Sequence, residues 1–376
     1  MYKELIATNY NYKTPINSSD DEKIKFTFNF KNAPSITFAY NLDYINACLK
    51  DVEIINKEYE NSGDWIDYLN FAFTEVRCAM HIENVDVDRK QIGAIYNNAV
   101  PINQNEIVIQ NFLKIVISII DNQFNTEQFS LKDIEDNWAI LASKLPDLNE
   151  NHKQYRQNKI ILKNNIATLD PELIPEALEQ LILFINNKND GIHPLVKSFM
   201  IELFLLWIHP YEKYSEFLAR ETAWNWSQRF TNWKRNGFFA FYVDTFKEFY
   251  RNHFSQVFEN QFDLSYFIKL GFERYTYIIK WSYIRYEIAS SSGPRLTQQQ
   301  IRILIFMKLD KKWEFIIDDF SNFLDNIEFN MTIDKLMQNI SKLIELSYLI
   351  EIEPGKWKIN HDVEYINKNI DSKNNY

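Results

Sequence analysis

The sequence has few residues that interrupt secondary structure and few that could crosslink it. Only 7 of its 376 residues are glycine and 10 are proline. This scarcity of turn-forming residues argues against a loop-rich fold and favours long helices. The two cysteines, Cys48 and Cys78, are too few for a disulfide framework and do not have a metal-ligand spacing. We therefore expect a mainly α-helical protein with reduced thiols.

Positive charge and long apolar runs are also in short supply. The 41 Lys and Arg residues against 51 Asp and Glu give a net charge of −10, which disfavours general binding to nucleic-acid phosphates or anionic membranes. The most apolar stretch, residues 199–208, is too short for a membrane span and contains Glu202. The first residues have no apolar signal-peptide core. We expect a cytoplasmic protein without membrane contact.

Large side chains are abundant, with 29 Phe, 21 Tyr and 9 Trp, and a chain of this length can build more than one folded part. We expect an N-terminal arm and first helix over residues 1–60, with a strand near 23–30. A helical core should cover 61–289. The small and helix-breaking residues at 290–294 indicate a linker before a second module at 295–361, and the polar residues 362–376 predict a flexible tail.

Apolar periodicity predicts most of the helices in the core. In the helix expected at 64–84, Trp65, Leu69, Phe73 and Val76 form one stripe. The other ranges expected to be helical, at least in part, are 44–60, 107–145, 173–186, 194–208, 220–230, 246–258 and the start of a last core helix at 263–268. The helix ending at residue 208 is apolar nearly all round, which is typical of a buried central helix.

That central helix leads into the segment His209-Pro210-Tyr211-Glu212-Lys213-Tyr214-Ser215-Glu216-Phe217-Leu218-Ala219-Arg220. The segment resembles the HPFx[D/E]GNGRxxR loop of the Fic (Fido) family of nucleotidyl and phosphate-group transferases. Three flanking segments resemble that family too: IHPLVK at 192–197, DLSYFI at 263–268, and Tyr155-Arg156 before the core. The resemblance covers roughly residues 65 to 285. It implies a Fic-type helical core with a small β-hairpin flap.

The resemblance also implies roles for particular positions. His209 would be the base that takes a proton from a target hydroxyl, and Arg220 would bind nucleotide phosphate. Glu83 and Asn84, at the end of the helix over 64–84, fit an N-terminal inhibitory helix whose Glu pairs with the last motif Arg. Tyr155 and Arg156 would begin the flap near 155–163, on which a target protein lies as an added strand.

The middle of the loop departs from the family pattern at consecutive positions. Lys213 stands at the acidic, magnesium-binding position, where an ammonium cannot serve as ligand. Tyr214 and Glu216 replace the two glycines that let a backbone approach phosphate, and Ser215 replaces the Asn. Phe217 removes an arginine. We therefore expect no metal and no cofactor, with ATP and Mg²⁺ required only if the protein is active.

Two functions remain open from the sequence. The first is a pseudoenzyme that binds a protein partner through the flap or assembles with itself. The second is an active transferase of AMP or another phosphate-containing group, with Glu212 as a substitute metal ligand or Lys213 as a phosphate contact. His209 could equally be a structural histidine at a helix end. We expect Arg220 to pair with Glu83, because a buried charge without a partner is costly.

The C-terminal segment resembles a winged helix, a module often appended to Fic cores. Thr297 and Gln300 form a capping-box pattern before a helix to residue 309. Helices expected at 315–324 and 332–347 precede strands at 348–352 and 356–359, joined by Pro354-Gly355 in a type II turn. Its lysines and arginines are matched by carboxylates, so we favour a structural or dimerising role over DNA binding or transcriptional regulation.

Overall fold

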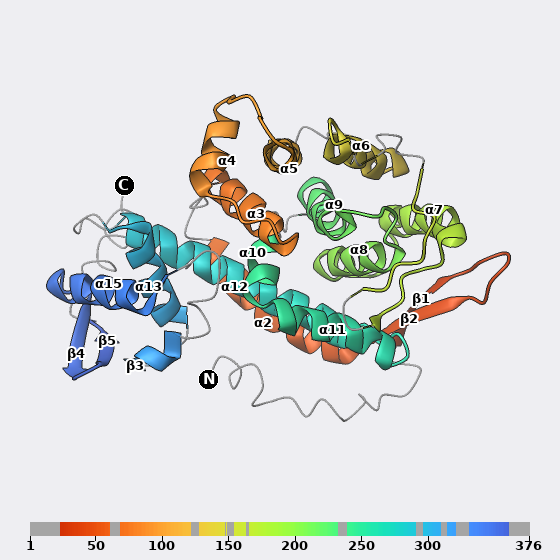
Figure 1. Ribbon diagram of the computed structural model, residues 1–376. Helices are drawn as coiled ribbons and strands as arrows, with labels where there is room; N and C mark the ends of the chain where they lie inside the picture. Colours follow the sequence, from red (N-terminus) through yellow and green to blue (C-terminus); the bar gives the residue numbers. More distant parts are fainter. Residues whose placement is uncertain are drawn as a thin grey trace, which may run out of the picture. The chain divides into compact units, whose positions relative to one another are not determined.

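The structure is a computed structural model that describes residues 23–60, 68–121, 128–146, 148, 154–162, 165–231, 239–290, 296–309, 314–320 and 331–360. It is mainly helical, as expected (Figure 1). The chain forms two compact units. The larger consists of Pro15–Ile55 and Asp67–Thr276, and the smaller of Met1–Thr14, Asn56–Ile66 and Tyr277–Tyr376. We describe each unit by itself.

The larger unit begins with an antiparallel hairpin of β1 (Lys23–Phe28) and β2 (Ile36–Asn41). The alternating sequence predicted β1, while β2 was not anticipated. The aromatic face of the hairpin packs on a central helix: the Phe28 and Phe38 rings lie 5.2 and 5.0 Å from that of Phe204. The alternation of the strand thus serves to cover that helix on one side.

The first and last helices of the larger unit continue into the smaller unit. The helices of the larger unit are α2 (Leu42–Glu60), α3 (Tyr68–Ile82), α4 (Arg89–Tyr96), α5 (Gln104–Ile120), α6 (Leu131–Ala142), α7 (Ile174–Asn186), α8 (Pro194–Ile208), α9 (Ser215–Phe230), α10 (Phe239–Thr245), α11 (Lys247–Glu259) and α12 (Ser265–Ser290). The short helices α4 and α10 were not anticipated.

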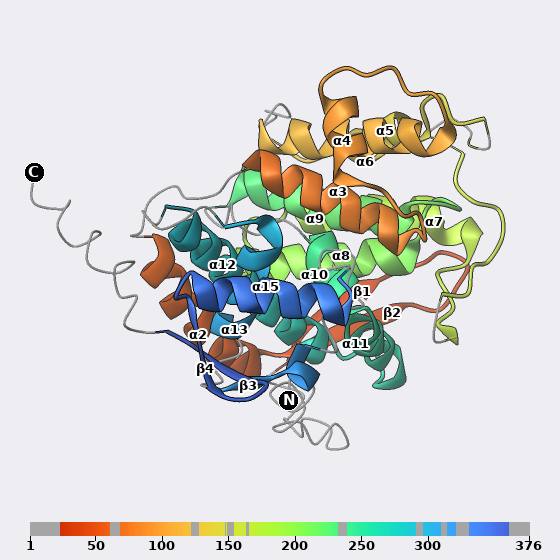
Figure 2. The ribbon, with the colours of Figure 1, turned by 60° about the vertical axis from the view of Figure 1, so that its left-hand side comes forward.

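Helices α8 and α9 run side by side at the centre of this unit (Figures 1 and 2). Every residue of α8 from Leu195 to Ile208 is buried, as its uniform apolar sequence predicted. Pro194 occupies its first turn, where a missing N–H costs nothing. The His-Pro loop joins these two helices, so their packing sets the position of the loop.

Two details of the predicted helices are wrong. The stripe on α3 is not uniformly core, because Leu69 is 42% exposed while Glu75 is fully buried. Helix α9 begins at Ser215 rather than Arg220, so Glu216 and Phe217 lie in its first turn. Trp65 lies outside the described residues.

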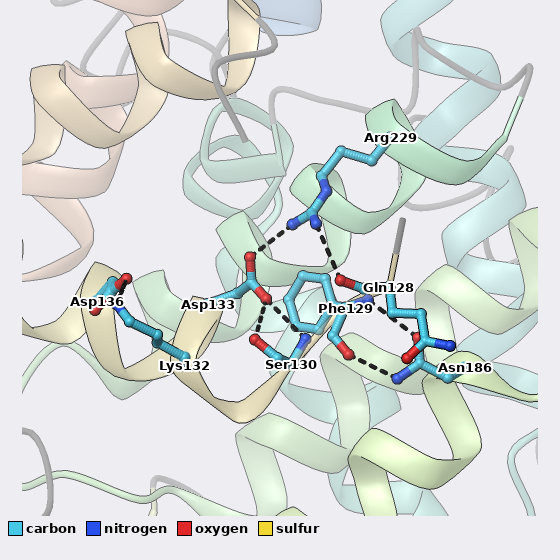
Figure 3. Close-up of polar contacts among 8 residues, drawn as sticks. All are labelled: Gln128, Phe129, Ser130, Lys132, Asp133, Asp136, Asn186 and Arg229. Atoms are coloured by element: carbon cyan, nitrogen blue, oxygen red, sulfur yellow. Dashed lines mark hydrogen bonds and ion pairs between the residues drawn. The ribbon is translucent and has the colours of Figure 1, made fainter. Parts of the chain in front are cut away.

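A polar cluster ties the far end of α9 to α6 and α7 (Figure 3). The buried Arg229 guanidinium donates to Asp133 Oδ1 at 2.8 Å, and Asp133 also caps α6 through Ser130. The Asn186 side chain exchanges two hydrogen bonds with the backbone of Phe129, at 2.6 and 3.0 Å. These contacts join α9, α6 and α7 at the end of α9 that lies away from the His-Pro loop.

The smaller unit contains a helix, a short strand, a 3₁₀ turn, a second helix and a hairpin. These are α13 (Gln298–Leu309), β3 (Phe315–Ile316), Ile317–Phe320, α15 (Ile333–Glu345), β4 (Leu349–Glu353) and β5 (Lys356–Ile359). The sheet order is β3-β5-β4, and Phe306, Phe315 and Phe320 pack together. Gly355 has φ 75°, as a type II turn requires.

The helix predicted at 315–324 is wrong over its described part, because Phe315 and Ile316 pair with Trp357 and Lys356 of β5. Strand pairing with a distant hairpin thus overrode the local helical pattern. No helix among the described residues combines the length and apolar character that a membrane crossing requires.

Candidate functional site

His209 ends α8 in the left-handed conformation, with φ 47°. Its side chain is buried, and Nδ1 has no hydrogen-bond partner among the described residues. Burial lowers the pKa of His209 to about 4, and the nearby Arg156 guanidinium acts in the same direction. The imidazole is therefore neutral near pH 7 and a weak base, poorly matched to proton abstraction at that pH.

Arg156 holds the His-Pro turn through hydrogen bonds to backbone carbonyl oxygens. Its guanidinium donates to the carbonyl oxygens of His209 at 2.6 Å, Ile208 at 3.2 Å and Leu169, and its backbone N–H donates to Pro210 O at 3.0 Å. These carbonyls lie at or next to the C-terminal end of α8, where a cation is favoured. Arg156, predicted as part of the flap, is thus a buried clamp on the loop.

Tyr211 and Ser215 close the loop into a tight, internally bonded turn. The Ser215 hydroxyl donates to Tyr211 O at 2.8 Å and accepts from Tyr211 N at 3.0 Å. The Tyr211 ring stacks on Trp138 with centroids 4.0 Å apart. Ser215 stands at the position where the family pattern has an Asn, and its hydroxyl is hydrogen-bonded to the backbone of the loop itself. The centroid of the Tyr155 ring, a residue predicted to belong to the flap, lies 5.7 Å from the centroid of the Tyr211 ring.

Tyr214 and Phe217 are anchored to α5. The Phe217 ring stacks on Phe112 at 3.9 Å and is completely buried, and Tyr214 meets Phe112 edge-on at 5.5 Å. Tyr214 has φ 58°, a left-handed conformation that glycine adopts more readily. The side chains at these two positions therefore attach the loop to α5.

The remaining loop positions face outward or toward Arg220. Glu212 and Lys213 are exposed. Glu216 lies in the first turn of α9, half-buried, with Oε2 3.9 Å from Arg220 Nη1. A carboxylate there interacts favourably with the positive end of the helix and with Arg220, so it opposes a phosphate at the same place.

Arg220 lies in a buried cluster of charges. Its side chain is completely buried, and its guanidinium makes no hydrogen bond to any described residue. Glu75 and Glu221 interact with it electrostatically. Burial raises the pKa of Glu75 to about 7 and raises that of Glu221 as well, although Arg220 acts in the opposite direction on both. We infer that the cluster holds at least one proton near neutral pH.

A second buried network stabilises the same core. Glu202 in the middle of α8 forms a bidentate ion pair with Arg274 at 2.8 and 2.5 Å and accepts a hydrogen bond from the Tyr250 hydroxyl at 2.8 Å. Glu75 in turn accepts from the backbone of Ala240 at 2.6 Å, at the start of α10. The sequence offered one signal for these groups: Glu202 inside an apolar helix.

Glu83 and Asn84 lie at the end of α3. Asn84 has φ 61°, and the bonds from its N–H to His81 O and from Val85 N–H to Met80 O complete a helix-terminating turn. Glu83 is half-buried. The expected ion pair between Glu83 and Arg220 is not formed. None of the three guanidinium nitrogens of Arg220 has a hydrogen-bond partner among the described residues, and the carboxylate within 4 Å of this guanidinium is that of Glu216.

The predicted flap contains a short hairpin. Ile161 and Ala167 form an antiparallel bridge, flanked by hydrogen bonds from Leu162 N to Ile166 O at 2.8 Å and from Thr168 N to Ile160 O at 3.0 Å. The Ile161 side chain is 67% exposed. The hairpin thus presents an exposed apolar residue near the loop.

A small cavity lies where the end of α3, the hairpin, α8, α9 and α11 meet. Its volume is about 40 Å³, and its lining includes Ile82, Leu162, Leu206 and Glu216. Pockets that hold drug-sized ligands span roughly 300–1,000 Å³, so a nucleotide would not fit without rearrangement. Within the described ranges, no group of three or more His, Cys, Asp or Glu side chains is placed to hold a metal ion.

Comparison with solved structures relates this arrangement to known folds. A Fic family protein from Desulfovibrio desulfuricans G20 aligns over 84% of this chain and 95% of its own, with a TM-score of 0.52 and 14% sequence identity. Fic-1 from C. elegans and a Fic domain containing signaling protein from Bacteroides thetaiotaomicron reach TM-scores of 0.48 and 0.47, at 16% and 13% identity, and cover 63% and 64% of this chain. The alignments include 71% of the Fic-1 chain and 97% of the B. thetaiotaomicron chain.

No protein-family model matches the sequence, and no curated protein matches it. At 14% identity, the likeness to the D. desulfuricans protein concerns the fold.

Proposed function

We propose that this chain uses a Fic fold without the phosphate chemistry of that fold, and that it acts by binding a protein partner. The observation that carries the proposal is the loop after His209. At the metal position the loop has the exposed cation Lys213. At the phosphate positions Phe217 packs into the core on Phe112, and Glu216 places a carboxylate in the first turn of α9. A site filled in this way lacks room and donors for Mg-ATP.

The basicity of His209 supports the same conclusion. A general base needs a pKa near the working pH and an accessible nitrogen. Burial gives His209 a pKa of about 4 and leaves its side chain almost without solvent contact. Arg156, which holds the carbonyl of His209, makes this burial a fixed feature of the loop.

Two surfaces are candidates for the partner. The hairpin around Ile161 has an exposed apolar side chain and strand backbone, which suits addition of a partner's strand. The described elements of the smaller unit and their β3-β5-β4 sheet support our proposal that this unit is a winged-helix-like module. The exposed face of α15 mixes acidic Asp334 and Glu345 with Lys335 and Lys342, so we assign it to protein contact, including self-association, rather than DNA.

Calorimetric titration with Mg-ATP tests the proposal. We expect no saturable heat for the wild type or for Glu83→Gly, because the obstruction lies in the loop and not at Glu83. Saturable binding by either protein would contradict the proposal.

A transfer assay addresses the active alternative. The full-length chain is incubated with labelled ATP and Mg²⁺, with His209→Ala as the matched variant. We expect the same background label in both. Label that depends on His209 would establish transferase activity and overturn the assignment.

A further inference from the structure

We propose that a second cavity, at the end of the α8–α9 pair away from the His-Pro loop, binds a small uncharged aromatic molecule with an N–H or O–H donor, such as indole. The cavity is bounded by the end of α7, the loop over residues 187–193, the first turn of α8 and the last turns of α9. It shares no lining residue with the cavity at Glu216. This inference is therefore independent of the proposed function.

The cavity has the size and composition of a small-molecule site. Its volume is about 310 Å³, against about 40 Å³ for the cavity at Glu216. Binding sites for small ligands typically measure roughly 300–1,000 Å³ and combine apolar walls with a few polar groups. The apolar part of this wall consists of Ile185, Ile192, Pro194, Trp226 and Phe230.

Trp226 and Phe230 favour a flat ring over an aliphatic ligand. They lie one turn apart on α9, with ring centroids 6.5 Å apart and an angle of 40° between the rings. The Arg229 guanidinium lies 4.9 Å from the centroid of Phe230 and is itself held by Asp133 (Figure 3). Aromatic rings attract one another in offset or edge-on contacts. An aromatic ligand therefore meets a wall that is already in place.

An internal ion pair in the cavity disfavours charged ligands. The Lys197 side chain is 5% exposed, and its ammonium donates to Asp190 Oδ2 and Asn187 O, both at 2.6 Å. The charges of Lys197 and Asp190 compensate each other, so a charged ligand would lose hydration without gaining an unpaired buried countercharge. Lys188 also lines the cavity, but it is exposed, and an ion pair in water contributes little.

Asp190 can still accept a hydrogen bond from a ligand. A carboxylate has about four acceptor positions. The described residues fill one on each oxygen, through Ile192 N–H at 3.0 Å and the Lys197 ammonium. The Asp190 side chain is 16% exposed and lines the cavity. Because hydrogen bonds to ionised acceptors are strong, a ring that carries a donor should bind more tightly than the same ring without one.

The test is titration of indole with the full-length chain, followed by saturation-transfer NMR. We expect saturable binding. 1-Methylindole, which lacks the N–H donor, should bind about tenfold more weakly, because one charge-assisted hydrogen bond is lost. Indole-3-acetate, which is charged, should also bind more weakly than indole. Both comparisons use the unchanged protein, so they do not depend on the folding of a variant.

Two variants locate the binding site. Ile192→Trp places a large ring at a half-buried position of the cavity wall and should abolish saturable indole binding. Ile54→Trp adds the same side chain at a 64% exposed position on α2, outside the cavity, and should bind indole as the wild type does. Circular dichroism verifies that both variants are folded.

Four results would overturn the inference: indole signals that do not saturate, equal affinity for indole and 1-methylindole, tighter binding of indole-3-acetate, or unchanged indole binding by folded Ile192→Trp. Mg-ATP binding contradicts the proposed function alone, since that function concerns the loop at the other end of α8. Absence of indole binding contradicts this inference alone.

Discussion

His209 and Glu75 are buried ionisable groups whose pKa values move in opposite directions. Burial disfavours the charged form of each, so it lowers the pKa of the histidine and raises that of the carboxylic acid. Each shift makes the stability of the fold depend on pH, with opposite signs. Substitution of one group at a time therefore separates the two contributions.

The His209 contribution should be lost in acid. Its pKa is about 4 in the folded chain against about 6.5 when unfolded, so the unfolded state binds the proton more readily. Its contribution is complete above pH 6.5 and disappears as the pH falls toward 4, by up to about 3 kcal/mol. His209→Asn, which tolerates the left-handed backbone, should flatten this dependence. Urea unfolding across this range measures it, and parallel curves for the two proteins would contradict the argument.

The Glu75 contribution should be lost as the pH rises. Its pKa is about 7 in the folded chain against about 4.5 when unfolded, so the folded state retains the proton. The contribution is complete below pH 4.5 and declines as the pH increases through 7. Glu75→Gln should therefore gain stability relative to the wild type over this window. Glu179→Gln, an exposed acid on α7, is the control, and a constant difference from the wild type would refute the assignment.

At the scale of elements, α12 approaches α8 closely because Gly271 has no side chain. A Cβ at this position would lie 2.3 Å from Cδ2 of Phe199. Gly271→Ala should therefore force the helices apart and destabilise the fold by about 1–3 kcal/mol. Gly93→Ala on α4 is the matched control, since its Cβ would make an ordinary 3.7 Å contact and helix propensity favours Ala. Equal unfolding midpoints for both variants would contradict close packing at Gly271.

The elements also show what periodicity can predict. Helix α8 was predictable because its burial on all sides leaves a continuous apolar run. The strand at Phe315 was not, because its conformation depends on pairing with Trp357 far along the chain. Helix α10 was missed too, and one of its anchors is Glu75, whose carboxylate accepts the backbone N–H of Ala240. Both contacts join residues far apart in the chain, so neither produces a periodic pattern in the local sequence.

For the whole molecule, the position of the candidate site could be predicted from the sequence, but its chemistry could not. His209 and Arg220 keep the register of the loop, so the loop's place at the end of α8 followed from motif spacing. The contacts that close it, Ser215 with Tyr211 and Phe217 with Phe112, are tertiary. The buried pair of Glu202 and Arg274 is likewise set by packing.

The whole molecule carries a net charge of −10, and its C-terminal unit has no strong excess of positive charge on α15. Non-specific DNA binding depends on releasing counterions from phosphates through clustered Lys and Arg. We therefore expect no saturable change in fluorescence anisotropy when the full chain is titrated into a labelled random duplex at low salt. Saturable binding that weakens steeply with salt and is lost in Lys335→Gln/Lys342→Gln would show that α15 reads DNA and would contradict the assignment of this surface to protein contact.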